Sequence, residues 1–141
     1  TIMKKILKIA FFIFIFSNPL YGKTQYLQEG INLFKNKKFE KAKFKFEKDI
    51  VYNPKSELSY LYLSKIFKNL DKKNLQEKNL NTVILLNPKN EEALFNLAEL
   101  KLDSSDYKKS KELNDKLNTI CIKFCKESKK LQVEIENLLK K

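Results

Sequence analysis

The feature that most constrains this chain is a tripeptide that occurs twice. Asn53-Pro54-Lys55 recurs as Asn87-Pro88-Lys89, 34 residues later, and each copy closes a block whose apolar residues are spaced as on a helix. Proline lacks an amide donor and restricts the residue before it, so each tripeptide is expected to end a helix. A fixed period of this size predicts an array of helical repeats, in which consecutive helix pairs bury their apolar faces against each other.

The first block carries the pattern most completely. Its small and apolar residues, at fixed offsets before Pro54, are Tyr26, Gly30, Leu33, Phe39, Ala42 and Phe46. This pattern resembles the tetratricopeptide repeat, which implies two helices per repeat with Gly30 and Ala42 at their closest contact. The expected fold is all-α: a right-handed α-solenoid of about three helix pairs, residues 23–56, 57–90 and 91–121, followed by a C-terminal helical extension, residues 122–141.

The later blocks follow the pattern less closely. The second has Lys73 and Gln76 where the repeat family usually has an aromatic residue and an alanine. The third has Lys101, Ser110 and Asn114 at positions that are usually apolar or small, and Ile122 replaces the closing proline. We therefore expect the third block to be a degenerate terminal copy.

The composition argues against several classes of site. The chain has no histidine and only two glycines, which removes the usual general base, the imidazole metal ligand and a glycine-rich phosphate loop. We therefore expect no enzyme activity, no metal and no cofactor. The formal net charge is +12, and every basic residue is lysine. Without arginine the bidentate contacts to bases and phosphates are missing, so we do not expect a nucleic-acid partner.

The first 22 residues resemble a secretory signal. Met3-Lys4-Lys5 precedes the apolar run Ile6 to Phe16, which is shorter than the roughly 20 residues that a membrane-spanning helix needs. We expect export to the periplasm or the cell envelope of a bacterium, with a short retained anchor as the alternative. No cysteine follows the apolar run directly, so we do not expect a lipoprotein signal.

The resemblance to tetratricopeptide repeats implies that a partner binds the inner, concave surface made by the first helix of each pair. We expect a mostly apolar groove for a protein segment with aromatic or aliphatic anchors and some acidic residues, bound as a helix or an extended peptide. The groove residues are Leu27, Ile31, Phe34, Leu58, Leu61, Tyr62, Lys65, Lys68, Phe95, Asn96 and Glu99. The expected function is a non-enzymatic scaffold that holds an envelope protein.

A second function stays open because the first block is rich in lysine. Residues 35–48 interleave lysines with Phe39, Phe44 and Phe46, of which Phe44 falls outside the predicted core. A basic surface of this kind binds a polyanion or an anionic membrane surface. This hypothesis predicts binding that weakens with added salt.

The C-terminal stretch keeps an unbroken helical pattern of apolar residues. We expect one continuous helix from about Asp106 to Leu139. On such a helix, Leu131, Ile135 and Leu138 form an exposed stripe that meets a second copy or a partner. The alternative is a break near residues 121–127 and a separate helix that folds back as a cap on the third pair.

The two cysteines, Cys121 and Cys125, lie one helical turn apart in this stretch. Disulfide geometry is poor at that spacing within a helix, so we expect both to be small packing residues. An intermolecular disulfide is the alternative.

Overall fold

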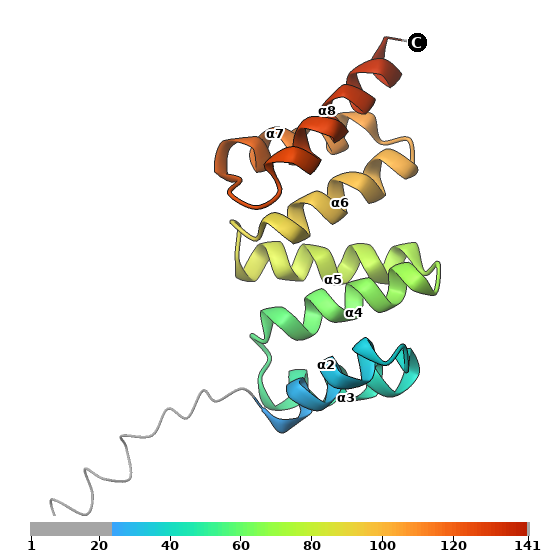
Figure 1. Ribbon diagram of the computed structural model, residues 1–141, viewed down its shortest axis with the longest axis vertical. Coiled ribbons are helices and arrows are strands. Elements are labelled where there is room, and N and C mark those ends of the chain that lie inside the picture. The colour runs from blue at the N-terminus through green and yellow to red at the C-terminus, as the bar shows by residue number, and fades with distance from the viewer. Residues whose placement is uncertain (1–23, 141) are drawn as a thin grey trace, which may run out of the picture.

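Residues 24–140 of the computed structural model form seven helices, and the structure is described for these residues. The helices are α2 (Gln25–Lys35), α3 (Phe39–Tyr52), α4 (Glu57–Asn69), α5 (Lys73–Leu86), α6 (Glu91–Asp103), α7 (Tyr107–Ile120) and α8 (Cys125–Leu139). Figure 1 shows the pairs stacked along the long axis, from α2 and α3 at one end to α8 at the other. The predicted all-helical repeat architecture is confirmed. None of these seven helices has the length and apolar character needed to cross a membrane, and the signal predicted at residues 1–22 lies outside the described residues.

The 34-residue period is preserved in the positions at which the helices begin. The second helices of the three pairs, α3, α5 and α7, begin at residues 39, 73 and 107. The helices α4, α6 and α8 begin at residues 57, 91 and 125, with the same spacing. Helix α8 therefore occupies the register of the first helix of a fourth pair.

The turn inside each pair also repeats. Lys37, Asp71 and Ser105 are spaced by 34 residues, and their φ values are positive, at 57°, 52° and 61°. In the first turn the N–H groups of Lys37 and Lys38 donate to the carbonyl oxygens of Phe34 and Leu33, both at 2.9 Å; the other two turns make the corresponding bonds. This Schellman geometry satisfies carbonyl groups at the end of each first helix and reverses the chain.

Gly30 permits a close approach of the two helices in the first pair. A Cβ atom placed on Gly30 would lie 2.7 Å from Cε1 of Phe46, which is completely buried. Ala42 is completely buried in the same cluster. The predicted helix contact is therefore confirmed at Gly30, because any larger side chain there would have to displace the ring of Phe46.

The core consists of two adjoining clusters. The N-terminal cluster packs α2 and α3 against α4 and includes Phe46, Ile66 and Phe67. The larger C-terminal cluster extends from Leu61 of α4 to Ile135 of α8. Helix α4 contributes to both clusters and so joins the two halves of the array.

The prediction of one continuous helix from Asp106 to Leu139 is wrong. Helix α7 ends at Ile120, residues 121–124 are not helical, and α8 folds back against α7 and α6. Leu131 and Ile135 are buried in the C-terminal cluster, and Leu138 packs against it. These three residues therefore belong to a capping helix that covers the end of the array, and they do not form a projecting association stripe.

Long-range polar contacts fix the break between α7 and α8. Asn114 is completely buried in α7, and its amide donates to the backbone oxygen of Ser128 at 3.0 Å. The Ser128 hydroxyl donates to Oδ1 of Asn114 at 2.8 Å. Glu91, at the start of α6, accepts hydrogen bonds from the N–H groups of Lys123 (2.8 Å) and Phe124 (2.9 Å). A straight helix would place Ser128 about 21 Å from Asn114 along its axis, so the observed bonds require the chain to reverse.

The reversal also brings the two cysteines together. Cys121 and Cys125 form a disulfide, and their Cα atoms are 5.2 Å apart. The expectation of two unbonded packing residues assumed a continuous helix and is wrong. Cys121 lies in the connection after α7, whereas Cys125 is the first residue of α8, so the helical spacing that disfavours a bridge does not apply.

Candidate functional site

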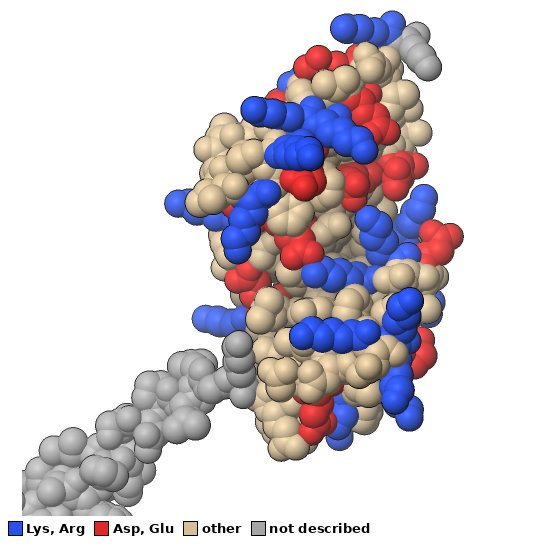
Figure 2. All heavy atoms as spheres, in the orientation of Figure 1, with Lys and Arg blue, Asp and Glu red and all other residues tan. Residues whose placement is uncertain are grey.

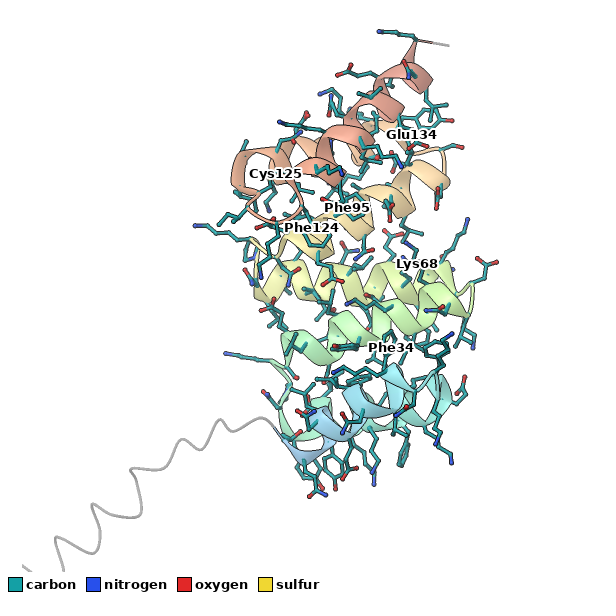
Figure 3. All side chains as sticks on the ribbon, viewed as in Figure 1. Phe34, Lys68, Phe95, Phe124, Cys125 and Glu134 are labelled. Atoms are coloured by element: carbon teal, nitrogen blue, oxygen red, sulfur yellow. A yellow bond between two sulfur atoms is a disulfide. The ribbon has the colours of Figure 1, made fainter. Side chains whose placement is uncertain are left out.

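The candidate site is the surface formed by α2, α4 and α6, the first helices of the three pairs, together with α8. We call this surface the first-helix face. Helix α2 contacts α4, and α6 contacts α8, while two ion pairs join α4 to α6. Figure 3 shows Phe34, Lys68, Phe95 and Glu134 distributed along the molecule from the α2 end to the α8 end.

Aromatic rings line the α2–α4 part of the first-helix face. The rings of Phe34 and Tyr62 meet edge-on with centroids 5.1 Å apart, and Tyr62 stacks on the buried Phe46 at 5.0 Å. Phe34 also contacts Phe39 of α3, with centroids 5.4 Å apart. Ile31 packs against the N-terminal cluster. Phe34, Tyr62 and Ile31 are half-buried, so this part of the face is apolar but already well packed.

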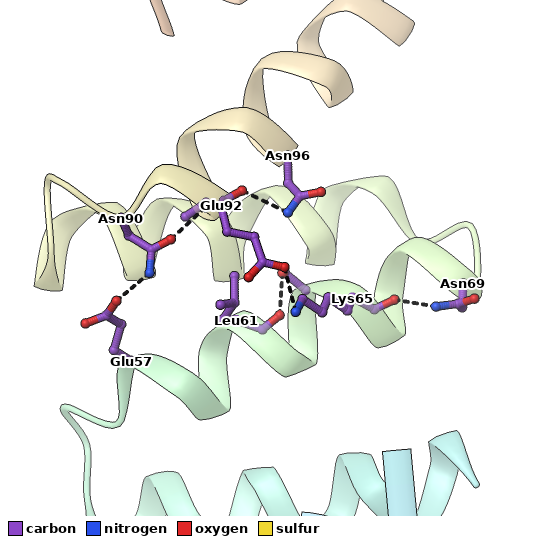
Figure 4. Close-up of polar contacts among 9 residues, drawn as sticks. Glu57, Leu61, Lys65, Asn69, Asn90, Glu92 and Asn96 are labelled. Carbon is purple, nitrogen blue, oxygen red and sulfur yellow. Dashed lines mark hydrogen bonds and ion pairs between the residues drawn. The ribbon is translucent and has the colours of Figure 1, made fainter. Parts of the chain in front are cut away.

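Two ion pairs cross the middle of the face. Lys65 Nζ lies 2.6 Å from Glu92 Oε1, and Lys68 Nζ lies 3.1 Å from Glu99 Oε2. Figure 4 shows the Lys65–Glu92 pair between α4 and α6, and Figure 2 shows lysines and acidic residues interspersed over the side of the molecule in view. Solvent-accessible pairs of this kind add little stability. Their consequence is electrostatic, because the protein's own carboxylates neutralise the two lysines that were expected to attract an acidic partner.

A cavity of about 150 Å³ lies between α6 and α8. Phe95 and Leu131 provide its apolar lining, and the ring of Phe95 lies 5.6 Å from that of Phe124, at the start of α8. Figure 3 shows Phe95 and Phe124 close together at this junction. The charged residues around the cavity are Glu99, Glu127, Lys130 and Glu134. Glu99 is already paired with Lys68, so Glu127 and Glu134, opposed by Lys130, leave the rim with a net negative charge.

The structure separates the predicted groove residues by their exposure. Leu27 and Leu61 are buried in the core, so they support the face from beneath. Leu58 is exposed near the start of α4, and Phe95 is half-buried beside the cavity. Asn96 donates its amide to a backbone oxygen of its own helix, at 2.8 Å.

The cavity also contains residues that sequence reasoning missed. Glu127, Lys130 and Glu134 come from α8, which was expected to project away from the repeats. The 34-residue spacing of the repeat, continued into α8, would have predicted that these residues lie beside α6. Leu97 and Leu131 are 34 residues apart and are both buried in the same cluster, as expected if α8 follows the pattern of a fourth first helix.

The perturbed carboxylates among residues 24–140 serve structural contacts. The pKa of Glu29 is lowered chiefly by its contact with the Lys45 ammonium group, and the pKa of Glu91 is lowered chiefly by the N–H group of Phe124. Neither residue lines the cavity between α6 and α8. The described part of the chain contains no group of three or more cysteine, aspartate or glutamate side chains placed to hold a metal ion.

Comparison with known proteins identifies the fold. No protein-family model and no curated protein sequence matches the chain, but solved structures do. The first TPR domain of Spaghetti (RPAP3), bound to the HSP90 peptide SRMEEVD, matches with a TM-score of 0.74 and 16% identity over 82% of this chain and 91% of that chain. The TPR2B domain of yeast Sti1, in a complex with pHsp70, matches with a TM-score of 0.73 and 15% identity over 81% and 98%.

A bacterial structure gives the same result. The Yersinia enterocolitica type III secretion chaperone SycD, in complex with a peptide of the translocator YopD, matches with a TM-score of 0.73 and 16% identity over 86% of this chain and 96% of that chain. The chain therefore has the tetratricopeptide-repeat fold, as the sequence pattern predicted.

Proposed function

We propose that this protein is a non-enzymatic scaffold that binds a segment of another protein on its first-helix face. The observation that carries the proposal is the cavity between α6 and α8, which leaves the half-buried Phe95 and the neighbouring Leu131 beside open space on the first-helix face. Structures of the same fold in complex with an HSP90 peptide and with a YopD peptide support a peptide-binding role.

The cavity favours a segment that carries an apolar anchor next to a basic residue. Phe95 and Leu131 offer the anchor an apolar contact, and Glu127 and Glu134 lie on the rim, where they can pair with lysine or arginine. This chemistry differs from the acidic partner expected from the sequence, because the groove lysines already pair with glutamates. It also disfavours a peptide such as SRMEEVD, whose carboxylates the acidic rim would repel.

We further propose that the scaffold works in the periplasm or the cell envelope of a bacterium. The signal-like segment at residues 1–22 is one support. The disulfide between Cys121 and Cys125 is another, because disulfides persist in oxidising compartments and are rare where thiols are kept reduced. Cell fractionation with N-terminal sequencing and thiol counting tests this proposal. A cytoplasmic protein with an intact N-terminus and two free thiols would contradict it.

Charge reversals on the rim test the groove without disturbing the core. Glu134 and Lys130 are both exposed on α8. The partner is first recovered from the envelope fraction with the wild-type protein as bait, and its affinity is then measured by calorimetry. Glu134→Lys should weaken binding by roughly twofold to fivefold and Lys130→Glu should strengthen it by a similar factor, as expected for exposed ion pairs. If Glu134→Lys strengthens binding and Lys130→Glu weakens it, the partner presents an acidic residue here and the proposed basic partner is wrong.

Removal of the anchor contact should have a larger effect. Phe95→Ala is expected to weaken partner binding at least tenfold, as for a buried aromatic contact at an interface. The matched control is Leu85→Ala, because Leu85 is 82% exposed on α5, outside the first-helix face. Circular dichroism checks that both variants remain folded. Equal affinity for the wild type and both variants would contradict binding in this cavity.

A further inference from the structure

One side of α3 exposes apolar side chains and lysines together. Phe44, Val51 and Tyr52 are 53%, 76% and 69% exposed. At 100° per residue these three side chains fall within a sector of about 100°, and Lys41 and Lys48 lie in the same sector. We call these five residues the α3 outer face. The Nζ atom of Lys48 lies 4.7 Å from the centre of the Phe44 ring, so the ammonium group and the aromatic ring are in contact on this face.

The positive charge of the described residues lies in the first two helix pairs, which include α3. Residues 24–90 contain 14 lysines and 7 acidic residues, whereas residues 91–140 contain 10 of each. On α3 itself, Glu40 is paired with Lys43 at 3.5 Å, and Glu47 lies at the edge of the outer face. Residues 24–56, with α2 and α3, have a net charge of +4, and residues 57–90 have +3. The first two helix pairs therefore carry the net positive charge of the described residues, and residues 91–140 are neutral.

The chain enters the array beside the α3 outer face. The Thr24 hydroxyl donates a hydrogen bond to the carboxylate of Asp49 in α3, and the ring of Tyr26 stacks on that of Tyr52 at 5.5 Å. The sequence before Thr24 contains the lysines and the apolar run of the signal-like segment, a composition that directs a chain to a lipid bilayer. Tyr26, near the start of the described residues, is thus next to the exposed Tyr52 of the α3 outer face.

We propose that the α3 outer face lies against an anionic lipid bilayer, separately from any partner on the first-helix face. Aromatic rings favour the headgroup level of a bilayer, and lysines near the surface are attracted to its anionic lipids. A second copy of the chain does not fit the same surface, because two lysine-bearing faces repel each other. Nucleic acid fits it poorly, because the chain has no arginine to grip phosphates bidentately.

Vesicle binding tests this proposal with matched charge changes. Wild-type and variant proteins are purified from the envelope fraction, and mass spectrometry confirms that they share one N-terminus. Sedimentation then measures their binding to phosphatidylglycerol–phosphatidylcholine vesicles. Each lysine near an anionic surface contributes about fivefold to binding. The double variant Lys41→Gln and Lys48→Gln should therefore bind roughly 25-fold more weakly than the wild type. The control double variant Lys108→Gln and Lys116→Gln removes the same charge from exposed positions on α7 and should bind within about twofold of wild type.

Two further measurements separate a bilayer from other anionic partners. The double variant Phe44→Ser and Val51→Ser should bind vesicles more weakly while its salt dependence stays the same, because it removes apolar contact and no charge. Soluble polyphosphate at equal charge should compete poorly. The proposal is overturned if the α7 control loses as much binding as the α3 lysine variant, or if the α3 lysine variant binds like wild type. It is also overturned if the serine variant binds like wild type or polyphosphate displaces the vesicles fully.

Discussion

The two ends of the array are completed in different ways. At the C-terminal end α8 covers the third pair, and the buried polar residues Asn114 and Ser128 hold it there. At the N-terminal end α2 and α3 are the outermost helices that residues 24–140 provide, and Phe44, Val51 and Tyr52 remain exposed. Terminal repeats need a polar or covered outer face to stay soluble. At the C-terminal end α8 covers the outer face of the third pair. At the N-terminal end the lysines of α3 make the outer face only partly polar.

The same repeat position shows what distinguishes the two ends. Phe46, Leu80 and Asn114 are spaced by 34 residues, and all three are completely buried. Phe46 fills the space beside Gly30 in the first pair, whereas Asn114 binds the backbone of α8. The position thus supports packing where another pair follows, and hydrogen bonding where a capping helix follows.

The largest effect is expected from removing the aromatic residue at the N-terminal end. Phe46→Ala should lower the free energy of unfolding by about 3–5 kcal/mol, because it leaves a cavity under Tyr62 and beside Gly30. Guanidinium denaturation followed by circular dichroism measures the change. Leu85→Ala, at a position that is 82% exposed, should change it by less than about 0.5 kcal/mol. A loss below about 1 kcal/mol for Phe46→Ala would mean that the N-terminal cluster repacks.

A somewhat smaller effect is expected from α8. Ile135→Ala should cost about 2–5 kcal/mol, because Ile135 is completely buried in the C-terminal cluster. The control on the same helix is Val133→Ala, since Val133 is 59% exposed. Unchanged stability after Ile135→Ala would contradict the cap and restore the idea of a projecting helix.

The smallest effect concerns the carboxylate that holds the connection before α8. The pKa of Glu91 lies below its usual value of 4.5, chiefly because the N–H group of Phe124 donates to it. A carboxylate with a lowered pKa stabilises the folded state above its unfolded pKa, and this contribution is lost as the pH falls through the folded pKa. Glu91→Gln should therefore slightly lower the melting temperature at neutral pH.

The pH series provides the control for this prediction. The difference between the wild type and Glu91→Gln should shrink as the pH falls below 4.5. Glu47→Gln, at an exposed position of α3, should leave the melting temperature unchanged throughout the series. A difference that persists undiminished in acid would show that the side-chain shape at position 91, and not its charge, supports the connection.

Most of the fold could be predicted because the determinants are local and periodic. The prolines end helices within their own block, and the apolar spacing identifies the buried face of each helix. The break before α8 could not be predicted in this way. It depends on pairs such as Asn114 with Ser128 and Glu91 with Phe124, which are 14 and 33 residues apart, while the local apolar pattern continues through the break.

The helices that form the candidate site were predictable, but the burial and the charge pairing of its residues were not. The first helix of each pair was identified correctly, yet Leu27 and Leu61 proved to be core residues because each helix must bury part of the face assigned to the groove. The pairing of Lys68 with Glu99 joins residues 31 positions apart. Position in a repeat does not reveal such a pair, because it depends on how neighbouring helices are packed.

The register of α8 bears on how the length of this protein can change. Its first residue follows that of α6 by 34 positions, just as α6 follows α4, so the cap occupies the place that a further pair would take. A duplicated 34-residue block inserted before α6 would present the same kind of surface to the helices on either side. Shorter or longer versions of the array could therefore keep the contacts that α8 makes with the pair before it, and growth by whole blocks would change the reach of the first-helix face.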